Sequence, residues 1–226
     1  YTTAVRTLVP NTTYTFVVRA VDAYNNVDGN TATASATTLV DNIPPTFAGA
    51  SSVSGLTYKT ATVNWAAATD DYTVAANMQY AICVTTTNGG CNDASFSATA
   101  TVTNQTSYSF PALLPNTTYY FVVRAKDQAG NFNTTNQNVQ VTATTPQEAN
   151  APVFAGLASA GSPTSSSIAL SWAAATDDYS SAVQITYNVY VATSPGGQNY
   201  LAPNATVAGV AGTNNYTFTG LSPGTA

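Results

Sequence analysis

The adjacent carboxylates of Asp70 and Asp71 are the residues in this sequence most suggestive of catalysis. A glycosidase uses two carboxyl groups, but they must face each other across the substrate. Neighbouring side chains in an extended loop tend to point apart instead. The sequence also contains no His, which excludes Ser-His and Cys-His nucleophilic arrangements and leaves no plausible zinc or haem ligand set. We therefore expect a protein that is not an enzyme.

Aromatic residues in polar loops suggest binding rather than catalysis. Tyr72, Tyr179, Tyr24 and Phe132 all lie in such loops. Their rings could stack on the sugars of surface glycans or fill a pocket of a protein partner. The alternative is that each ring packs over its own domain. Tyr72, Tyr179 and Phe132 are our candidate binding residues.

Two long phrases occur twice and define the elements that must position these residues. The phrase at residues 8–20, LVPNTTYTFVVRA, returns almost unchanged at residues 113–125, and WAAATDDY occurs at both 65–72 and 172–179. Repetition at a nearly fixed period indicates repeated structural units. Each unit spans about 105 residues, as the spacing of the two copies of each phrase indicates.

The repeat also makes the cysteines informative. Aligning Tyr80 with Tyr187 places Cys83 opposite Tyr190 and Cys91 opposite Gln198. Both cysteines are thus missing together from the other copy, as expected of a bonded pair. The intervening TTTNGG predicts a hairpin turn that brings the flanking strands together. We predict a Cys83–Cys91 disulfide and hence an oxidising compartment; two free buried thiols are the alternative.

Apolar residues alternate with other residues along each unit, which is the pattern of strands with one buried face. Tyr119, Phe121, Val123 and Ala125 show this period of two. No capped helix is evident. About seven short strands per hundred residues predict an all-β sandwich. The other strands expected in the complete unit are 60–66, 78–86, 96–103, 106–110 and 137–144.

Several of these residues together resemble the fibronectin type III domain. They comprise a Trp on the second strand, a Tyr on the third and a Leu-x-Pro-x-Thr-x-Tyr motif before the sixth, which resembles the tyrosine corner of that family. Openings such as PPTFAG and endings such as RAKDQAGN are similar to repeats strung along large bacterial surface proteins. The resemblance implies tandem immunoglobulin-like sandwiches. Its expected core residues are Trp65, Tyr80, Tyr119, Phe121, Trp172, Tyr187 and Tyr14.

The resemblance also implies one complete domain and two incomplete ones. Residues 1–40 correspond to the last strands of a domain, residues 41–146 to a complete domain, and residues 147–226 to the first five strands of a third. Proline-bearing linkers should align the domains in a semi-rigid row. Either the sequence is a window on a longer chain of repeats, or incomplete ends of neighbouring copies complete each other.

In the topology of that family, several oxygen-bearing side chains would lie at one pole of the complete domain: Asp41, Asp70, Asp71, Asp127 and Asn131. Oxygen ligands at a domain junction suit Ca²⁺, which would stiffen the row. Alternatively, these Asp and Asn side chains only bond their own backbone in turns. We expect no other cofactor.

Composition favours a secreted or cell-surface protein. Only 7% of the residues are charged, compared with about 25% in ordinary soluble domains. Five basic against ten acidic residues argue against a nucleic-acid partner. No apolar run approaches the roughly 20 residues that span a bilayer, so no membrane insertion is expected.

The function that we predict is a non-catalytic extracellular scaffold, such as a spacer, stalk or surface fibre, whose partners are other domains of its own chain or neighbouring copies. One alternative is a filament subunit that assembles head to tail through its incomplete ends. A second is a carbohydrate-binding accessory module of a secreted enzyme.

Overall fold

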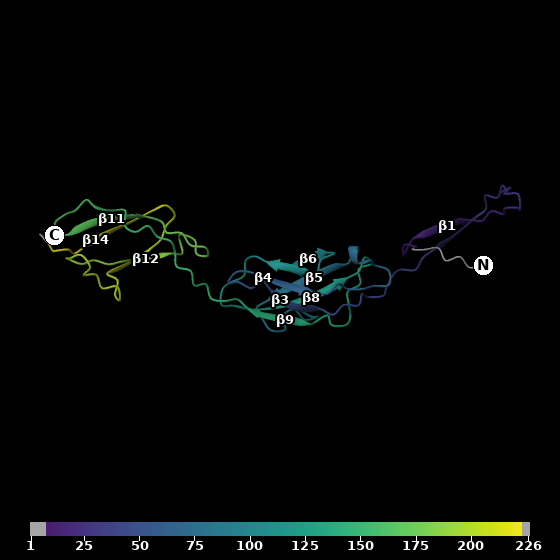
Figure 1. Cartoon of the computed structure of the whole chain (residues 1–226), viewed down its shortest axis with the longest axis horizontal. Coiled ribbons are helices and arrows are strands. Elements are labelled where there is room, and N and C mark those ends of the chain that lie inside the picture. Colours follow the sequence, from purple (N-terminus) through teal and green to yellow (C-terminus); the bar gives the residue numbers. More distant parts are fainter. Residues whose placement is uncertain (1–7, 223–226) are drawn as a thin grey trace. The chain divides into compact units, whose positions relative to one another are not determined.

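The computed structural model describes residues 8–222 and shows a protein built from antiparallel strands (Figure 1). The only other regular element of the described residues is a short 3₁₀ turn, η1 at Ala75–Asn77. The chain divides into two compact units, residues 1–147 and 148–226. The fold is therefore all-β, as the alternating sequence pattern predicts.

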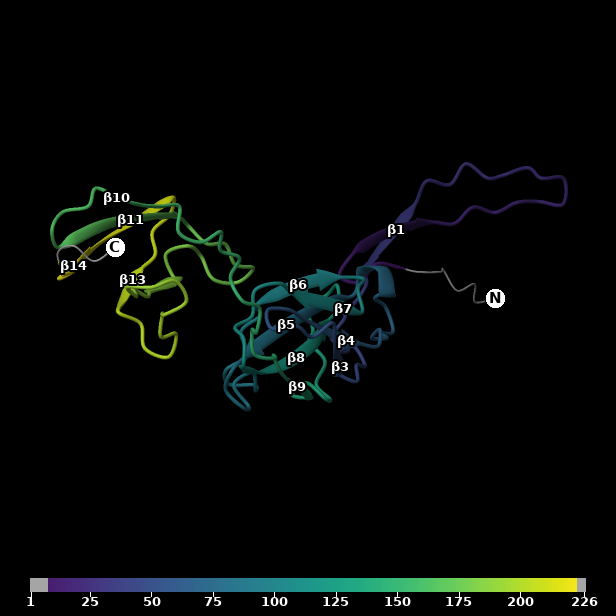
Figure 2. The same cartoon turned by 60° about the vertical axis from the view of Figure 1, so that its left-hand side comes forward.

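The first unit begins with a hairpin of β1 (Thr13–Val17) and β2 (Thr33–Thr37). Figure 2 shows it as a narrow two-stranded ribbon with a long loop. The Tyr14 hydroxyl accepts a hydrogen bond from the Val9 backbone N–H at 2.7 Å, so the tyrosine corner forms. Phe16 is nevertheless 42% exposed because no second sheet covers this hairpin. Tyr14, expected in a core, is consequently half-buried and belongs to no buried cluster.

Strands β3 to β9 form a sandwich of two sheets. One sheet has three strands in the order β3-β4-β7, and the other has four in the order β6-β5-β8-β9. The first sheet contains β3 (Ala50–Ser54), β4 (Ala61–Trp65) and β7 (Ser107–Phe110). The second contains β5 (Gln79–Thr85), β6 (Ala100–Thr103), β8 (Thr118–Lys126) and β9 (Gln140–Thr144).

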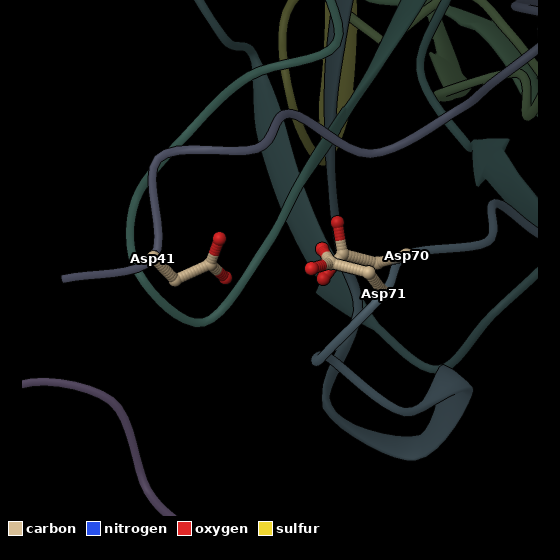
Figure 3. A group of neighbouring side chains, drawn as sticks. All are labelled: Asp41, Asp70 and Asp71. Atoms are coloured by element: carbon tan, nitrogen blue, oxygen red, sulfur yellow. The ribbon is translucent and has the colours of Figure 1, made fainter. Parts of the chain in front are cut away.

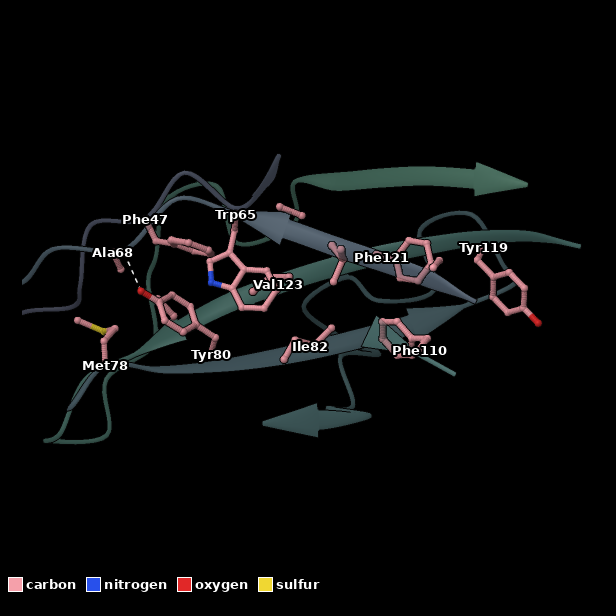
Figure 4. Close-up of a cluster of buried hydrophobic side chains, with 14 of the residues drawn as sticks. Phe47, Trp65, Ala68, Met78, Tyr80, Ile82, Phe110, Tyr119, Phe121 and Val123 are labelled. Carbon is pink, nitrogen blue, oxygen red and sulfur yellow. Dashed lines mark hydrogen bonds between the residues drawn. The ribbon is translucent and has the colours of Figure 1, made fainter. Parts of the chain in front are cut away.

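Aromatic side chains fill the space between these two sheets (Figure 4). Tyr80 is 1% exposed, and its ring centroid lies 5.4 Å from those of both Trp65 and Phe47. Its hydroxyl accepts a hydrogen bond from the Ala68 backbone N–H at 2.8 Å. Burial raises the pKa of Tyr80, and the bond from Ala68 opposes this shift. Farther along the core, Phe121 is fully buried.

The tyrosine corner of the sandwich ties its second sheet to the preceding turn. The Tyr119 hydroxyl accepts a hydrogen bond from the Leu114 N–H at 2.8 Å, and the Thr117 hydroxyl donates to the Pro115 carbonyl at 2.7 Å. The buried Thr145 hydroxyl donates to the Leu114 carbonyl at 2.6 Å. The Pro, Thr and Tyr of the Leu-x-Pro-x-Thr-x-Tyr motif thus bond within one turn and hold its shape.

The second unit repeats the early part of this plan. Its sheets contain β10 (Ser159–Gly161), β11 (Ser167–Ala173) and β14 (Thr213–Thr219) in one, and β12 (Thr186–Val189) and β13 (Ala205–Ala208) in the other. Among the described residues of this unit, the buried apolar cluster comprises Trp172, Ala175, Ile185 and Tyr187. Beside this core lies an apolar hollow of about 320 Å³.

All five strands expected at given ranges are present, with shorter bounds. The expected strand at 96–103 begins only at Ala100, because residues 96–98 have no regular structure and Thr99 lies in a bend. Strand β3 was not among the strands expected from the sequence. Its residues, ASSVS, contain a single large apolar side chain, Val53, and its pairing with β4 contains a bulge between Ala50 and Ser52.

Candidate functional site

Three acidic side chains meet at one end of the sandwich. Asp41 comes from the segment that enters the domain, whereas Asp70 and Asp71 come from the loop after β4. One carboxylate oxygen from each lies within 4.8 Å of the others. Figure 3 shows Asp70 and Asp71 side by side, with the Asp41 carboxylate directed toward them. The structure thus brings together residues 30 positions apart in the sequence.

The hydrogen bonds of this cluster satisfy only some of its oxygens. Asp70 Oδ2 accepts from the backbone N–H groups of Tyr72 at 3.1 Å and Thr73 at 2.7 Å. Asp41 Oδ1 accepts from the Ile43 N–H at 3.0 Å. The second oxygens of these two residues, Asp41 Oδ2 and Asp70 Oδ1, are buried and have no partner among the described residues. Such groups are costly unless they gain a ligand.

The two other expected ligands have different roles. Asp127 is 2% exposed, and its Oδ1 accepts from the N–H groups of Gly130 at 2.6 Å and Asn131 at 2.7 Å. Its Oδ2 accepts from Asn131 Nδ2 at 2.7 Å. The Asp127 carboxylate therefore bonds the backbone of its own loop, as the turn-forming alternative to a Ca²⁺ ligand predicts. Asn131 Nδ2 also donates to the Asp41 carbonyl at 3.2 Å, so it positions the segment that carries the cluster.

The equivalent loop of the second unit uses its carboxylates in hydrogen bonds. Asp177 Oδ1 accepts from the Tyr179 N–H at 3.0 Å, as Asp70 does from Tyr72. Asp178 Oδ2 accepts from Asn150 Nδ2 at 3.0 Å. The counterpart of Asp41 in the aligned repeat is Glu148, whose Oε1 accepts a hydrogen bond from the Asn150 backbone N–H.

The candidate binding aromatics are dispersed. Tyr179 lies in the second unit and is 39% exposed, while Phe132 lies in the first and is 41% exposed. Tyr72 is half-buried and lines a shallow hollow with Pro10, Val40 and Gln128 among others. Lys126 Nζ lies 5.6 Å from the centroid of the Phe132 ring.

Cys83 and Cys91 form the expected disulfide, with their Cα atoms 6.0 Å apart. The sulfur atoms pack with Val122 and the ring of Phe96 on the outer face of the second sheet. No sequence motif predicts the residues that pack beside them. Arg124, within the repeated VVRA phrase, is largely buried against Phe96 there.

Four hollows of the described residues are each lined by at most one acidic side chain. The adjacent Asp70 and Asp71 instead converge with Asp41 on one point. Among the described residues, no helix is long and apolar enough to cross a bilayer.

Two antiparallel sheets, a buried Trp and Tyr between them and a tyrosine corner define an immunoglobulin-like β-sandwich. The profile of the fibronectin type III domain matches residues 44–142. Residues 44–142 therefore form a fibronectin type III domain, as the motifs suggest.

Comparison with curated proteins finds bacterial relatives. The chain is 32% identical to exoglucanase B of Cellulomonas fimi over 97% of its own length and 18% of the relative. It is 31% identical to chitinase A1 of Niallia circulans over 80% of its own length and 24% of the relative. The chain thus spans less than a quarter of these relatives.

Among solved structures, the chain is similar to a segment of two fibronectin type III domains from chicken tenascin. The TM-score is 0.34 at 18% identity, covering 76% of this chain and 82% of that one. A chitinase from Bacillus thuringiensis, ChiA74, gives a TM-score of 0.31 at 18% identity, with 79% of this chain and 27% of that one covered.

Proposed function

We propose that this chain is a non-catalytic accessory segment of a secreted bacterial protein that acts on polysaccharides, and that it separates and orients the other domains of that protein. The observation that carries this proposal is its match to small fractions of an exoglucanase and a chitinase. A spacer must resist unfolding outside the cell. The buried aromatic core and the Cys83–Cys91 disulfide suit this requirement.

A domain exchange in the full-length protein tests this proposal. Deleting residues 41–146 should lower hydrolysis of insoluble substrate while hydrolysis of a small soluble substrate is unchanged. Inserting an unrelated sandwich of equal length should restore most of the lost activity, since a spacer contributes distance and stiffness. If the deletion has no effect, the segment does not act as a spacer. If the native domain restores more activity than the unrelated sandwich does, the domain contributes binding in addition to distance.

We also propose that the cluster of Asp41, Asp70 and Asp71 holds Ca²⁺. Its two buried oxygens without partners and its three converging carboxylates support this role. A hard cation with oxygen ligands would satisfy both features. Because Asp41 lies at the entry to the domain, bound Ca²⁺ would fix the incoming segment against the loop after β4 and stiffen the junction.

A further inference from the structure

A groove runs over the outer face of the four-stranded sheet, away from the acidic cluster. Alternation along β5 directs Tyr80 and Ile82 into the core, and Gln79 and Ala81 outward. Ala81 lies in register between Thr101 of β6 and Arg124 of β8. Because its side chain is a single methyl group between longer neighbours, it forms the floor of a hollow of about 470 Å³.

One wall of this groove is held rigidly. The Arg124 guanidinium lies 4.1 Å from the centroid of the Phe96 ring. Its Nη2 donates to Asp93 Oδ1 at 2.7 Å and to Asn138 Oδ1 at 2.8 Å, and its Nε donates to the Gln137 carbonyl at 3.0 Å. Arg124 is only 9% exposed, so these bonds are largely shielded from water.

The disulfide reinforces the same wall. Cys83, Cys91 and Val122 form a small buried cluster against which Phe96 packs. The bond therefore fixes the loop that carries both Phe96 and Asp93. A preformed wall lowers the conformational entropy lost on binding, which favours recognition of a ligand.

The residues at the other edge of the groove are Phe132 and Lys126. Their backbones pair in an isolated bridge, and the Lys126 ammonium lies over the Phe132 ring. The Phe132 ring is 41% exposed. The groove therefore combines aromatic rings with the polar ends of Gln79, Thr101 and Lys126.

We infer that this groove binds an uncharged polysaccharide chain; the inference rests on the accessory role proposed above. A pyranose ring presents a C–H face that packs on an aromatic ring and a rim of hydroxyl groups that bond to amide, hydroxyl and ammonium groups. Sites for such ligands are concave, with aromatic walls and a few placed polar groups.

The charges of the groove favour an uncharged ligand. The Asp93 carboxylate neutralises Arg124 in a salt bridge of 2.7 Å, which leaves Lys126, over the Phe132 ring, as a cation of the groove with no ion pair among the described residues. One ammonium is too little to hold a polyanion, whose binding depends on several neutralised charges. Of the three candidate sugar contacts expected from the sequence, Phe132 lines this groove. Tyr72 lines a different hollow, and Tyr179 lies in the second unit.

Binding of the whole chain to swollen cellulose and to colloidal chitin, measured by depletion from solution, tests this inference. The chain should bind at least one of these probes. Phe132→Ala and Gln79→Ala should each weaken its affinity about fivefold to tenfold, since each removes about 1–1.4 kcal/mol of contact. Ala81→Leu, which fills the floor, should weaken it similarly. Tyr24→Ala, which removes a ring that is 87% exposed in another loop, should have no effect.

Thermal unfolding of each variant shows whether the sandwich remains intact, so loss of binding can be separated from loss of fold. Absence of binding to both probes would overturn the inference, as would binding that the three groove variants leave unchanged. Loss of binding only on Tyr72→Ala would move the site to the loop after β4. None of these outcomes affects the spacer role, which the domain exchange tests separately.

Discussion

The sandwich of β3 to β9 and the second unit share their central aromatic arrangement but differ in how far it is covered. Tyr80 and Tyr187 each accept a hydrogen bond from a backbone N–H, at 2.8 and 2.7 Å. Each also packs on a Phe ring, with centroids 5.4 and 5.3 Å apart. Yet Phe47 is 2% exposed whereas Phe154 is 45% exposed.

Two further features show the same difference. Trp65 Nε1 donates to the Gln105 carbonyl at 3.0 Å, but Trp172 Nε1 is buried without a partner among the described residues. In the sandwich of β3 to β9, Phe121 and Val123 of β8 are fully buried. In the second unit, an apolar hollow lies beside Trp172 and Tyr187. The Trp–Tyr centre is thus a local arrangement, and closing the core requires strands like β8 and β9.

The largest effect is expected from the same substitution at two repeat positions. Phe121→Ala should lower the free energy of unfolding of the complete domain by about 3–5 kcal/mol, because it leaves a cavity in a packed core. Phe16→Ala, at the equivalent position of the hairpin, should change the same free energy of unfolding by at most about 0.5 kcal/mol. Urea unfolding followed by Trp65 fluorescence, in a Trp172→Phe background, measures both. Equal losses would contradict the uncovered state of Phe16.

The apolar hollow of the second unit should accept a hairpin like that of β8 and β9. A peptide of residues 113–146, added to the whole chain, should bind the hollow beside Trp172. In a Trp65→Phe background, binding should shift the fluorescence of Trp172. At a hundred times Kd, binding should stabilise this unit by about 2.7 kcal/mol. A peptide carrying Phe121→Ser and Val123→Ser is the control. If the native peptide fails to bind and the chain sediments as an oligomer, neighbouring copies already fill the hollow.

Removing the disulfide should affect only one of the two units. Replacing both Cys83 and Cys91 by Ala should lower the stability of the complete domain by about 2.5 kcal/mol in the chain-entropy model for so short a loop. The second unit carries Tyr190 and Gln198 at these positions, so its transition should not move. Calorimetry of both proteins resolves the two transitions. A shift of both would show that the units unfold together.

The smallest expected effect comes from Ca²⁺. At ten times Kd, the ion should stabilise the complete domain by about 1.4 kcal/mol, and Asp71→Asn should abolish this gain. Asp28→Asn, in the exposed loop of the hairpin, should leave it intact. Thermal unfolding with EDTA or CaCl₂ measures the difference. Equal midpoints in both solutions would show that the cluster is merely a set of turn residues.

The sequence alone was sufficient to predict the fold class, the family and the disulfide. These depend on local features: a period of two is the geometry of a strand, and the Leu-x-Pro-x-Thr-x-Tyr motif bonds within five residues, from Tyr119 to Leu114. The joint absence of two cysteines is also visible in an aligned repeat. The domain bounds, and the count of one complete and two incomplete domains, stay predictions.

Only the tertiary structure decided which polar residues meet. Asp127 and Asp70 look alike in sequence, yet Asp127 is saturated by its own loop while Asp70 keeps a buried oxygen beside Asp41. The groove over Ala81 likewise arises from strand register, which places β5, β6 and β8 side by side although they are distant in sequence. Alternation shows which face a residue occupies, but only pairing across strands determines its neighbours.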